Sequence, residues 1–274
     1  MQKGIGIIGI IMAMAAALVL MAGPASAVER LTITGSTTVL PIAQKAAEVF
    51  MKKYDVNVSV AGTGSGDGIK SIIDGMADIG NASRDMKPKE IKLAESKGVK
   101  PVRHTVGMDC IVPVVHPSNP VSNLTLAQLM AIYTGKISNW SEVGGNDKPI
   151  VAISRDSSSG TFEVWNKLVL KKKRVRPDAQ MQASNGAVSQ AVASNKYAIG
   201  YVGLGYLNAK LKPLKVENVM ATTATAKDKS YPVARRLFMF TRGEPVGMVK
   251  TFLDFVKGPE GQRIAEEEGF VSFR

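Results

Sequence analysis

Residues 154–165 read SRDSSSGTFEVW and place one arginine, Arg155, and a Ser-Gly-Thr turn, Ser159 to Thr161, at the start of a predicted helix. Hydroxyls, backbone N–H groups and a guanidinium all donate hydrogen bonds, and a helix start adds unpaired N–H groups with a partial positive charge. This combination suits an oxyanion. The alternative is that the serines only cap the helix, which is their commonest role at such a position.

The same arrangement occurs twice more in the chain. GSTTVLP at 35–41 and GTGSGDG at 62–68 each follow a short predicted strand and precede a helical pattern, and NASRDMK at 81–87 adds Ser83 and Arg84 after another strand. The glycines of 62–68 do not follow the dinucleotide spacing, and no phosphate-binding GxxxxGK[ST] loop is present. Three donor-rich helix starts and two arginines therefore indicate a site for one small tetrahedral anion.

The elements that would position these turns alternate along the chain. Short apolar strands, such as 31–34 and 56–60, precede amphipathic helices, and this order is typical of an α/β fold. Residues 108–116 read as a buried strand and 231–241 as a long strand. Two helices are expected near 249–256 and 259–268, and the polar segment 222–230 is expected to be a loop.

Residues 1–27 have the pattern of a secretory signal peptide, with Lys3, an apolar run and the Ala-Ser-Ala ending at Ala27. A retained membrane anchor is the alternative, because the apolar run is nearly long enough to cross a bilayer. No cysteine stands at the cleavage point, so we expect no lipid anchor there. The expected mature chain, 28–274, is then exported to the periplasm or an equivalent exterior. Its only cysteine, Cys110, allows no internal disulfide and reads as a buried apolar residue.

The chain carries a formal net charge of +12, which favours anionic partners. Nucleic acid is disfavoured, because the basic residues are scattered and aromatic residues are few. The one dense basic run, KKKRVR at 171–176, ends a helical pattern and suits a solvated helix end.

Enzymatic chemistry has little support in the sequence. The two histidines, His104 and His116, adjoin no nucleophile motif, and there is no GxSxG elbow. Two histidines and one cysteine also make a closed zinc site improbable, so we expect no metal and no cofactor. A secreted phosphoesterase is the alternative from another functional class.

The chain resembles the phosphate-binding proteins of bacterial ATP-driven phosphate uptake, within the periplasmic binding-protein family, over most of 28–274. The motif R-x-x-x-S-G-T, present as Arg155, Ser159, Gly160 and Thr161, is the most diagnostic part. The resemblance implies a monomeric receptor that binds inorganic phosphate without breaking a bond and delivers it to the membrane permease of an ABC transporter. The ligand-binding residues that it implies, with neighbours added from the sequence, are Ser36, Thr37, Thr38, Ser65, Ser83, Arg84, Asp109, Arg155, Ser159, Gly160 and Thr161.

The resemblance also implies a fold, a two-lobed periplasmic binding-protein fold of type II with the ligand in the cleft between the lobes. Lobe 1 would comprise 28–107 and 231–274, and lobe 2 would comprise 108–230. The chain would cross between the lobes near Met108 and Tyr231.

One departure concerns the choice of anion. Some family members have an aspartate directly after the serine of the fourth turn, where it accepts a proton from hydrogen phosphate and repels sulfate. Here Arg84 follows Ser83, and three other aspartates, Asp85, Asp109 and Asp67, are candidates for the acceptor. A receptor for sulfate, molybdate or tungstate is therefore the alternative among binding proteins.

Overall fold

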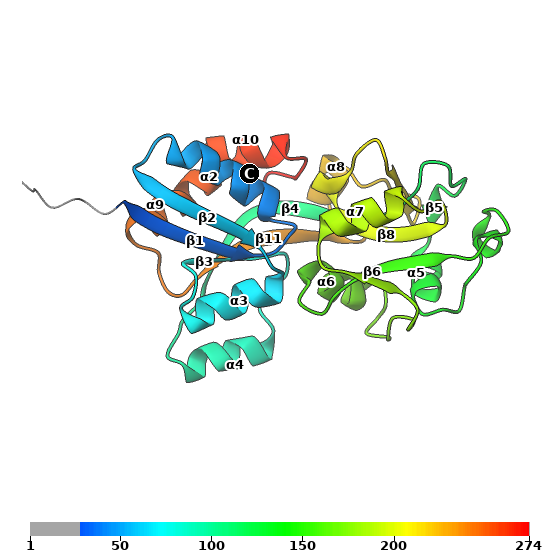
Figure 1. Ribbon diagram of the computed structural model, residues 1–274, viewed down its shortest axis with the longest axis horizontal. Coiled ribbons are helices and arrows are strands. Elements are labelled where there is room, and N and C mark those ends of the chain that lie inside the picture. Colours follow the sequence, from blue (N-terminus) through cyan, green and yellow to red (C-terminus); the bar gives the residue numbers. More distant parts are fainter. Residues whose placement is uncertain (1–27, 274) are drawn as a thin grey trace, which may run out of the picture.

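Two long antiparallel strands, β4 (Val102–Val115) and β11 (Ala234–Thr241), join two lobes in the computed structural model, which describes residues 28–273 (Figure 1). β4 begins before the predicted 108–116, and its first residues, Val102–Thr105, are exposed or only partly buried, so they lack the continuous apolar run of the second half. That half pairs with β11, whereas Ile111–Val115 pairs with β8. β4 therefore belongs to the sheets of both lobes.

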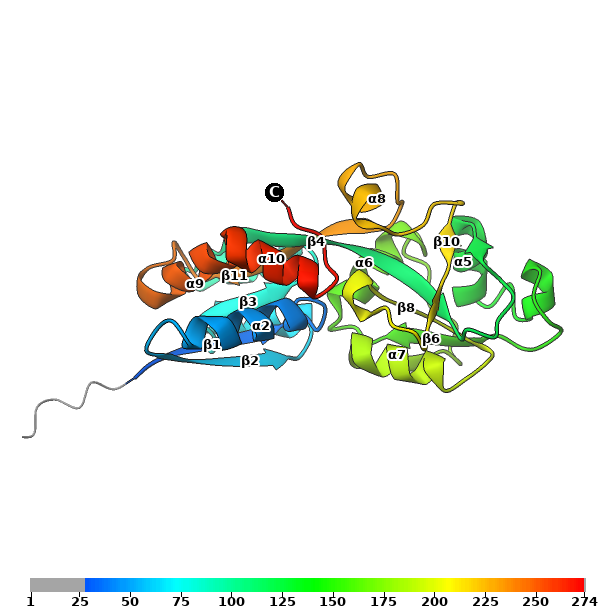
Figure 2. The ribbon, with the colours of Figure 1, turned by 90° about the horizontal axis from the view of Figure 1, so that it is seen from above.

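The first lobe is built on strands β1 (Glu29–Gly35), β2 (Val56–Gly62) and β3 (Ile79–Ala82). β1 lies parallel to both others, and β3 pairs antiparallel with β11. Helices cover both faces of this sheet, as Figures 1 and 2 show. The helices of this lobe are α2 (Leu40–Met51), α3 (Ser65–Asp74), α4 (Pro88–Ser96), α9 (Gly247–Lys257) and α10 (Pro259–Glu267).

Apolar spacing explains how these helices pack. In α2 the buried residues Ile42, Ala43, Ala46, Ala47 and Phe50 recur at intervals of three and four, so they form one stripe against the sheet. α9 and α10 share this core, whereas α3 and α4 bury Ile69, Ile72 and Ala94 in a separate cluster with β11. The lobe thus has a helix layer on each side of its sheet.

The second lobe has its own core around three aromatic side chains, Tyr133, Trp165 and Tyr201. The rings of Trp165 and Tyr201 stack with centroids 4.3 Å apart. Its strands are β5 (Asn123–Leu124), β6 (Val151–Arg155), β7 (Gln180–Gln182), β8 (Ala198–Gly203), β9 (Lys212–Pro213) and β10 (Lys215–Val216). Its helices are α5 (Leu126–Tyr133), α6 (Gly160–Leu168), α7 (Asn185–Ala193) and α8 (Thr223–Lys227), with 3₁₀ turns η1 (Trp140–Val143) and η2 (Leu204–Tyr206).

The α/β class is confirmed, and three local expectations need correction. α8 lies inside the predicted loop 222–230, where the Thr222 hydroxyl accepts the N–H of Thr225 and caps a short helix. β7 and α7 were not predicted, because α7 is rich in small residues and its apolar periodicity is weak. β11 begins at Ala234, three residues after the predicted start of that strand.

Among residues 28–273, no helix combines the length and apolar character that crossing a lipid bilayer requires. The signal peptide predicted for 1–27 lies outside the described residues. The boundaries proposed for the two lobes stay a prediction.

Gly35 offers a test of the close packing at the end of β1. Its φ is +131°, and an added Cβ would lie 2.2 Å from the carbonyl oxygen of Asn81. We expect Gly35→Ala to destabilise the protein by about 3 kcal/mol or more, since backbone strain and overpacking add. Gly98→Ala is the matched control: its φ is also positive, at +67°, but no atom lies within 4 Å of the added Cβ. It should cost about 1 kcal/mol. Equal shifts in Tm for the two variants would contradict the packing argument.

Candidate functional site

Four polar turns from the two lobes meet beside β4 and β11. The carboxyl ends of the parallel strands β1 and β3 lie at one sheet edge, which brings the turn after β1 next to Ser83 and the start of α3. The start of α6 reaches the same place from the second lobe. We call the hydroxyl residues of these turns the donor cluster. All of its members are buried: Ser36, Thr37, Thr38, Ser65, Ser83, Ser159 and Thr161.

The lobes are in direct contact at the donor cluster. The hydroxyls of Thr38 and Thr161 lie 3.0 Å apart, and the N–H of Gly66 donates to the carbonyl of Ser158 at 2.9 Å. Gly160 packs so closely that an added Cβ would lie 2.3 Å from the Ser65 hydroxyl oxygen. Only glycine fits there, because any side chain would separate α6 from α3.

Arg155 lies at the end of β6, with its side chain buried against the donor cluster. Its Nε donates to the carbonyl of Gln182, and its Nη2 donates to the carbonyl of Ala183 and to the hydroxyl of Thr37. Its Nη1 is buried without a protein partner. Burial lowers the pKa of this guanidinium, since the charged form loses its hydration. One amino group of a fixed buried cation, Nη1, is thus left for another acceptor.

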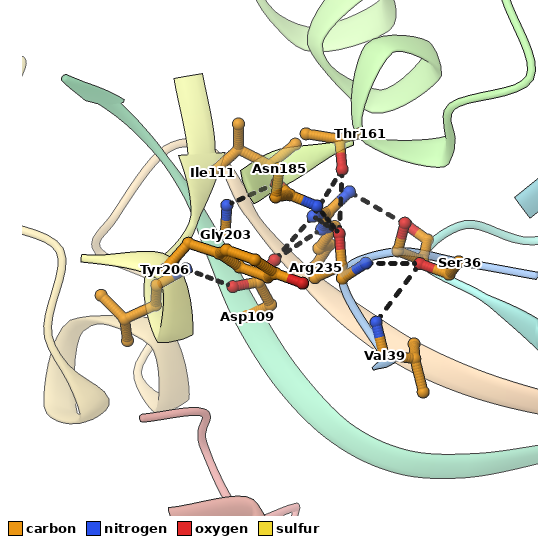
Figure 3. A network of polar contacts seen from close by, with 12 residues as sticks. Ser36, Val39, Asp109, Ile111, Thr161, Asn185, Gly203, Tyr206 and Arg235 are labelled. Atoms are coloured by element: carbon orange, nitrogen blue, oxygen red, sulfur yellow. Dashed lines mark hydrogen bonds and ion pairs between the residues drawn. The ribbon is translucent and has the colours of Figure 1, made fainter. Parts of the chain in front are cut away.

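Arg235, which the sequence analysis did not single out, supplies the second buried guanidinium (Figure 3). Its Nη2 donates to the hydroxyls of Thr38, at 3.2 Å, and Thr161, at 3.1 Å, so it touches both lobes. Val233, Arg235 and Leu237 alternate on the buried face of the segment, whereas Arg236 is exposed. That period of two was the signal that could have found it.

Asp109 holds Arg235 in place. The two residues are cross-strand partners on β4 and β11, and Asp109 Oδ2 accepts from Nη2 at 2.6 Å and from Nε at 2.9 Å. Its Oδ1 accepts the N–H of Leu204 at 2.8 Å. The carboxylate is fully buried, and burial raises its pKa while the guanidinium opposes that rise.

Asn185, at the start of α7, was also missed. Its Oδ1 accepts the N–H of Gly203 at 3.1 Å, which fixes the amide so that Nδ2 faces the hydroxyls of Thr37, at 3.1 Å, and Thr38, at 3.0 Å (Figure 3). The signal was a serine before a helix, Ser184, but the helix itself was not recognised.

The direction of these hydrogen bonds determines what the donor cluster can bind. The side-chain N–H groups of Arg155, Arg235 and Asn185 can only donate, so the hydroxyl oxygens of Thr37 and Thr38 must accept. The Thr37 hydroxyl proton is therefore left to donate elsewhere, whereas either Thr38 or Thr161 donates in the contact between their two hydroxyls. A site with outward O–H groups and two guanidinium groups is suited to an oxyanion.

Other candidates from the sequence lie apart from this network. Arg84 donates to both carboxylate oxygens of Glu90, at 2.7 and 2.8 Å, and to the carbonyl of Asp85. Its contacts do not include the hydroxyls of the donor cluster. Its part in binding stays a prediction.

Two of the three candidate acceptor aspartates also lie elsewhere. Asp85 is exposed and pairs with Arg103, and Asp67 is exposed on the first turn of α3. Partial loss of hydration, together with the charge of Asp156, raises the pKa of Asp67. Asp109 is the candidate that adjoins the donor cluster, through Arg235.

The described part of the chain has no cluster of side chains arranged for metal binding or for nucleophilic catalysis. Residues 28–273 contain no group of three or more His, Cys, Asp or Glu side chains placed to hold a metal ion. His104 bonds to Thr241, and His116 bonds to Ser118. Cys110 is buried, which raises its pKa to about 12.

The comparisons with known proteins agree on one family. A sequence model described as a PBP superfamily domain matches residues 21–260. The chain is 32% identical to the phosphate-binding protein PstS of Bacillus subtilis, covering 88% of this chain and 80% of that protein, and 32% identical to the protein SphX of Synechococcus elongatus, covering 88% and 76%.

Solved structures extend the match to the fold. A putative phosphate ABC transporter substrate-binding protein from Clostridium perfringens, solved with bound phosphate, has a TM-score of 0.84 at 36% identity, covering 90% of this chain and 100% of that one. An ABC-type phosphate transport receptor from Vibrio cholerae has a TM-score of 0.73 at 30% identity, covering 88% and 99%. The chain therefore belongs to the PBP superfamily and, within it, to the family of phosphate-binding proteins of ABC-type phosphate uptake.

Proposed function

We propose that this protein is an exported receptor that binds inorganic phosphate between its lobes and delivers it to the membrane permease of an ABC transporter. The observation that carries the proposal is the donor cluster, in which two buried arginines, Arg155 and Arg235, donate to hydroxyls of both lobes. The relative from Clostridium perfringens, solved with bound phosphate, supports the choice of ligand.

The donor cluster also explains how another protein would recognise the ligand-bound state. Contacts such as Thr38 to Thr161 exist only when the lobes are together, so an anion that both lobes hold favours the closed arrangement. The permease would recognise that arrangement. In this proposal lobe 1 comprises 28–107 and 231–274, lobe 2 comprises 108–230, and the receptor acts as a monomer without nucleic acid.

No bond is broken in this mechanism. The serines lack a base, since neither His104 nor His116 contacts the donor cluster, so we propose a binding protein rather than a phosphoesterase. Residues 1–27 would direct export and be removed by cleavage after Ala27.

Isothermal titration of the purified protein, freed of bound anion, tests the ligand directly. We expect one-to-one binding of phosphate and no response to sulfate or molybdate. We also expect Asp109→Asn to reduce the preference for phosphate over sulfate by about tenfold or more, because Arg235 then keeps an uncompensated charge that attracts a fully ionised anion. Thermal unfolding checks that the variant is folded. Tight sulfate binding by the unaltered protein would overturn the choice of phosphate, and binding of none would overturn the site.

Arg155→Ala should weaken phosphate binding by about 2 kcal/mol or more, roughly a 30-fold rise in Kd, because a buried charged donor is lost. Arg174→Ala is the control, since Arg174 is an exposed arginine of the same lobe. Titration calorimetry measures both variants. An unchanged Kd for Arg155→Ala would show that the guanidinium does not face the anion.

Asn185→Asp tests the direction of the hydrogen bonds. The new carboxylate would accept protons from Thr37 and Thr38 and repel an anion, so we expect roughly a 100-fold loss of phosphate affinity. Asn185→Ala removes the amide without adding charge and should lose less. Asn195→Asp makes the same change where the side chain only accepts the N–H of Tyr197, and should bind normally. Equal affinity of the two Asp variants would contradict the proposed proton directions.

A further inference from the structure

A hollow of about 780 Å³ adjoins the donor cluster. Ser83 and Arg235 line the hollow and also belong to, or contact, the donor cluster. Its other walls come from both lobes, with Arg103 and Arg236 on β4 and β11 and Lys167 and Lys172 on and after α6. This outer cavity therefore adjoins the proposed phosphate site and touches both lobes.

The outer cavity carries a surplus of positive charge. Seven of its lining side chains are basic and two, Asp85 and Glu163, are acidic. Four of the seven are engaged in ion pairs: Arg84 with Glu90, Lys87 with Glu163, Arg103 with Asp85, and Arg235 with Asp109.

The other three cations have no such compensation. Across residues 28–273, no carboxylate lies within salt-bridge distance of Lys167, Lys172 or Arg236. Two of them belong to the second lobe and one to the first. Two residues that line the cavity, Arg84 and Asn166, also carry a buried polar atom without a partner, Nε and Oδ1 respectively.

These features select a class of ligand. Three uncompensated cations attract an anion with several charges, and their distribution over both lobes favours an anion whose charges are spread along the molecule. A single phosphate group is small compared with a space of this volume. A chain of linked phosphate groups satisfies both requirements, because each phosphate carries its own charge and acceptor oxygens.

We propose that the outer cavity is a second anion site, which binds an oligophosphate chain and bridges the two lobes. The chain could be inorganic or part of a nucleoside triphosphate, since the recognised chemistry is the same. Binding in the outer cavity does not depend on the proposed phosphate receptor, but its consequence does. A ligand that contacts both lobes favours their closed arrangement and therefore slows release of phosphate from the donor cluster.

The test is calorimetric titration of the phosphate-saturated protein with tripolyphosphate, without divalent cations and at an ionic strength near 0.15 M. At this ionic strength charges more than about 8 Å away are largely screened. The probe variant is Lys167→Glu/Lys172→Glu. The matched control is Lys171→Glu/Lys173→Glu, which reverses the same charge in the same segment at residues that do not line the cavity; all four lysines are exposed.

We expect the cavity variant to weaken tripolyphosphate binding at least tenfold and the control to weaken it less than threefold. Binding of ATP with similar affinity, and no binding of adenosine, would support recognition of the phosphate chain in either source. Tripolyphosphate binding without ATP binding would also support it and restrict the ligand to inorganic chains. Equal losses in the two variants, or no tripolyphosphate binding by the unaltered protein, would overturn the proposal.

Two further measurements separate this proposal from the proposed function. Arg155→Ala should lose phosphate affinity but keep tripolyphosphate binding that still responds to Lys167→Glu/Lys172→Glu. Stopped-flow release of phosphate should slow severalfold in tripolyphosphate, and an unchanged rate would overturn the bridging of the lobes. If the unaltered protein fails to bind phosphate but binds tripolyphosphate in the outer cavity, only the phosphate receptor is wrong.

Discussion

The ion pair between Asp109 and Arg235 is the interaction on which the arrangement of the site depends. It joins two adjacent strands, β4 and β11, where they pass between the lobes, and it is almost completely buried. Removing one partner of such a pair costs about 3–5 kcal/mol, because the other charge stays buried and unpaired. Arg235 therefore keeps one position, from which it reaches Thr38 in one lobe and Thr161 in the other. The strands that connect the lobes thus carry the group that senses whether the lobes are together.

The remaining polar side chains extend this constraint outward. Asn185 is fixed by the N–H of Gly203, and its amide then fixes the hydroxyl oxygens of Thr37 and Thr38 as acceptors. A hydroxyl that accepts a hydrogen bond keeps its own proton as a donor, so the donor cluster as a whole offers more donors than acceptors. An anion can be stabilised by such neutral dipoles without one countercharge for each negative oxygen. Two cations are then sufficient, one of them already compensated by Asp109.

The sequence predicted the turns of this site better than it predicted the side chains that orient them. Strand-turn-helix patterns at 35–41, 62–68 and 154–161 were recognisable because glycine and hydroxyl residues mark strand ends, and parallel strands bring those ends to one edge. Arg235 could have been found from the alternation of buried and exposed residues along its strand, which places this arginine at a buried position. Asn185 lies on a helix of small residues whose periodicity was too weak to show. Arg84 is expected to face an anion because it follows Ser83; in the structure its guanidinium is held by Glu90 in the first turn of α4, and its part in binding stays a prediction. Sequence adjacency places a residue near a site, whereas the partner that a side chain finds depends on the tertiary fold.

The contacts between the lobes explain why such a site can be reversible. Many of them are polar or charged: hydroxyl to hydroxyl at Thr38 and Thr161, backbone to backbone at Gly66 and Ser158, and an ion pair between Lys87 and Glu163 at 2.5 Å. Each such contact contributes little net free energy, because water replaces it when the lobes separate. Most apolar side chains are packed in two main cores, one in each lobe, although Val271 of the first lobe packs in the second core and Tyr206 of the second lobe packs against the first. Closure also depends on the charge that an anion brings to Arg155 and Arg235. A ligand held by both lobes then shifts the equilibrium by its differential affinity for the closed form, and this is the quantity that a permease could read.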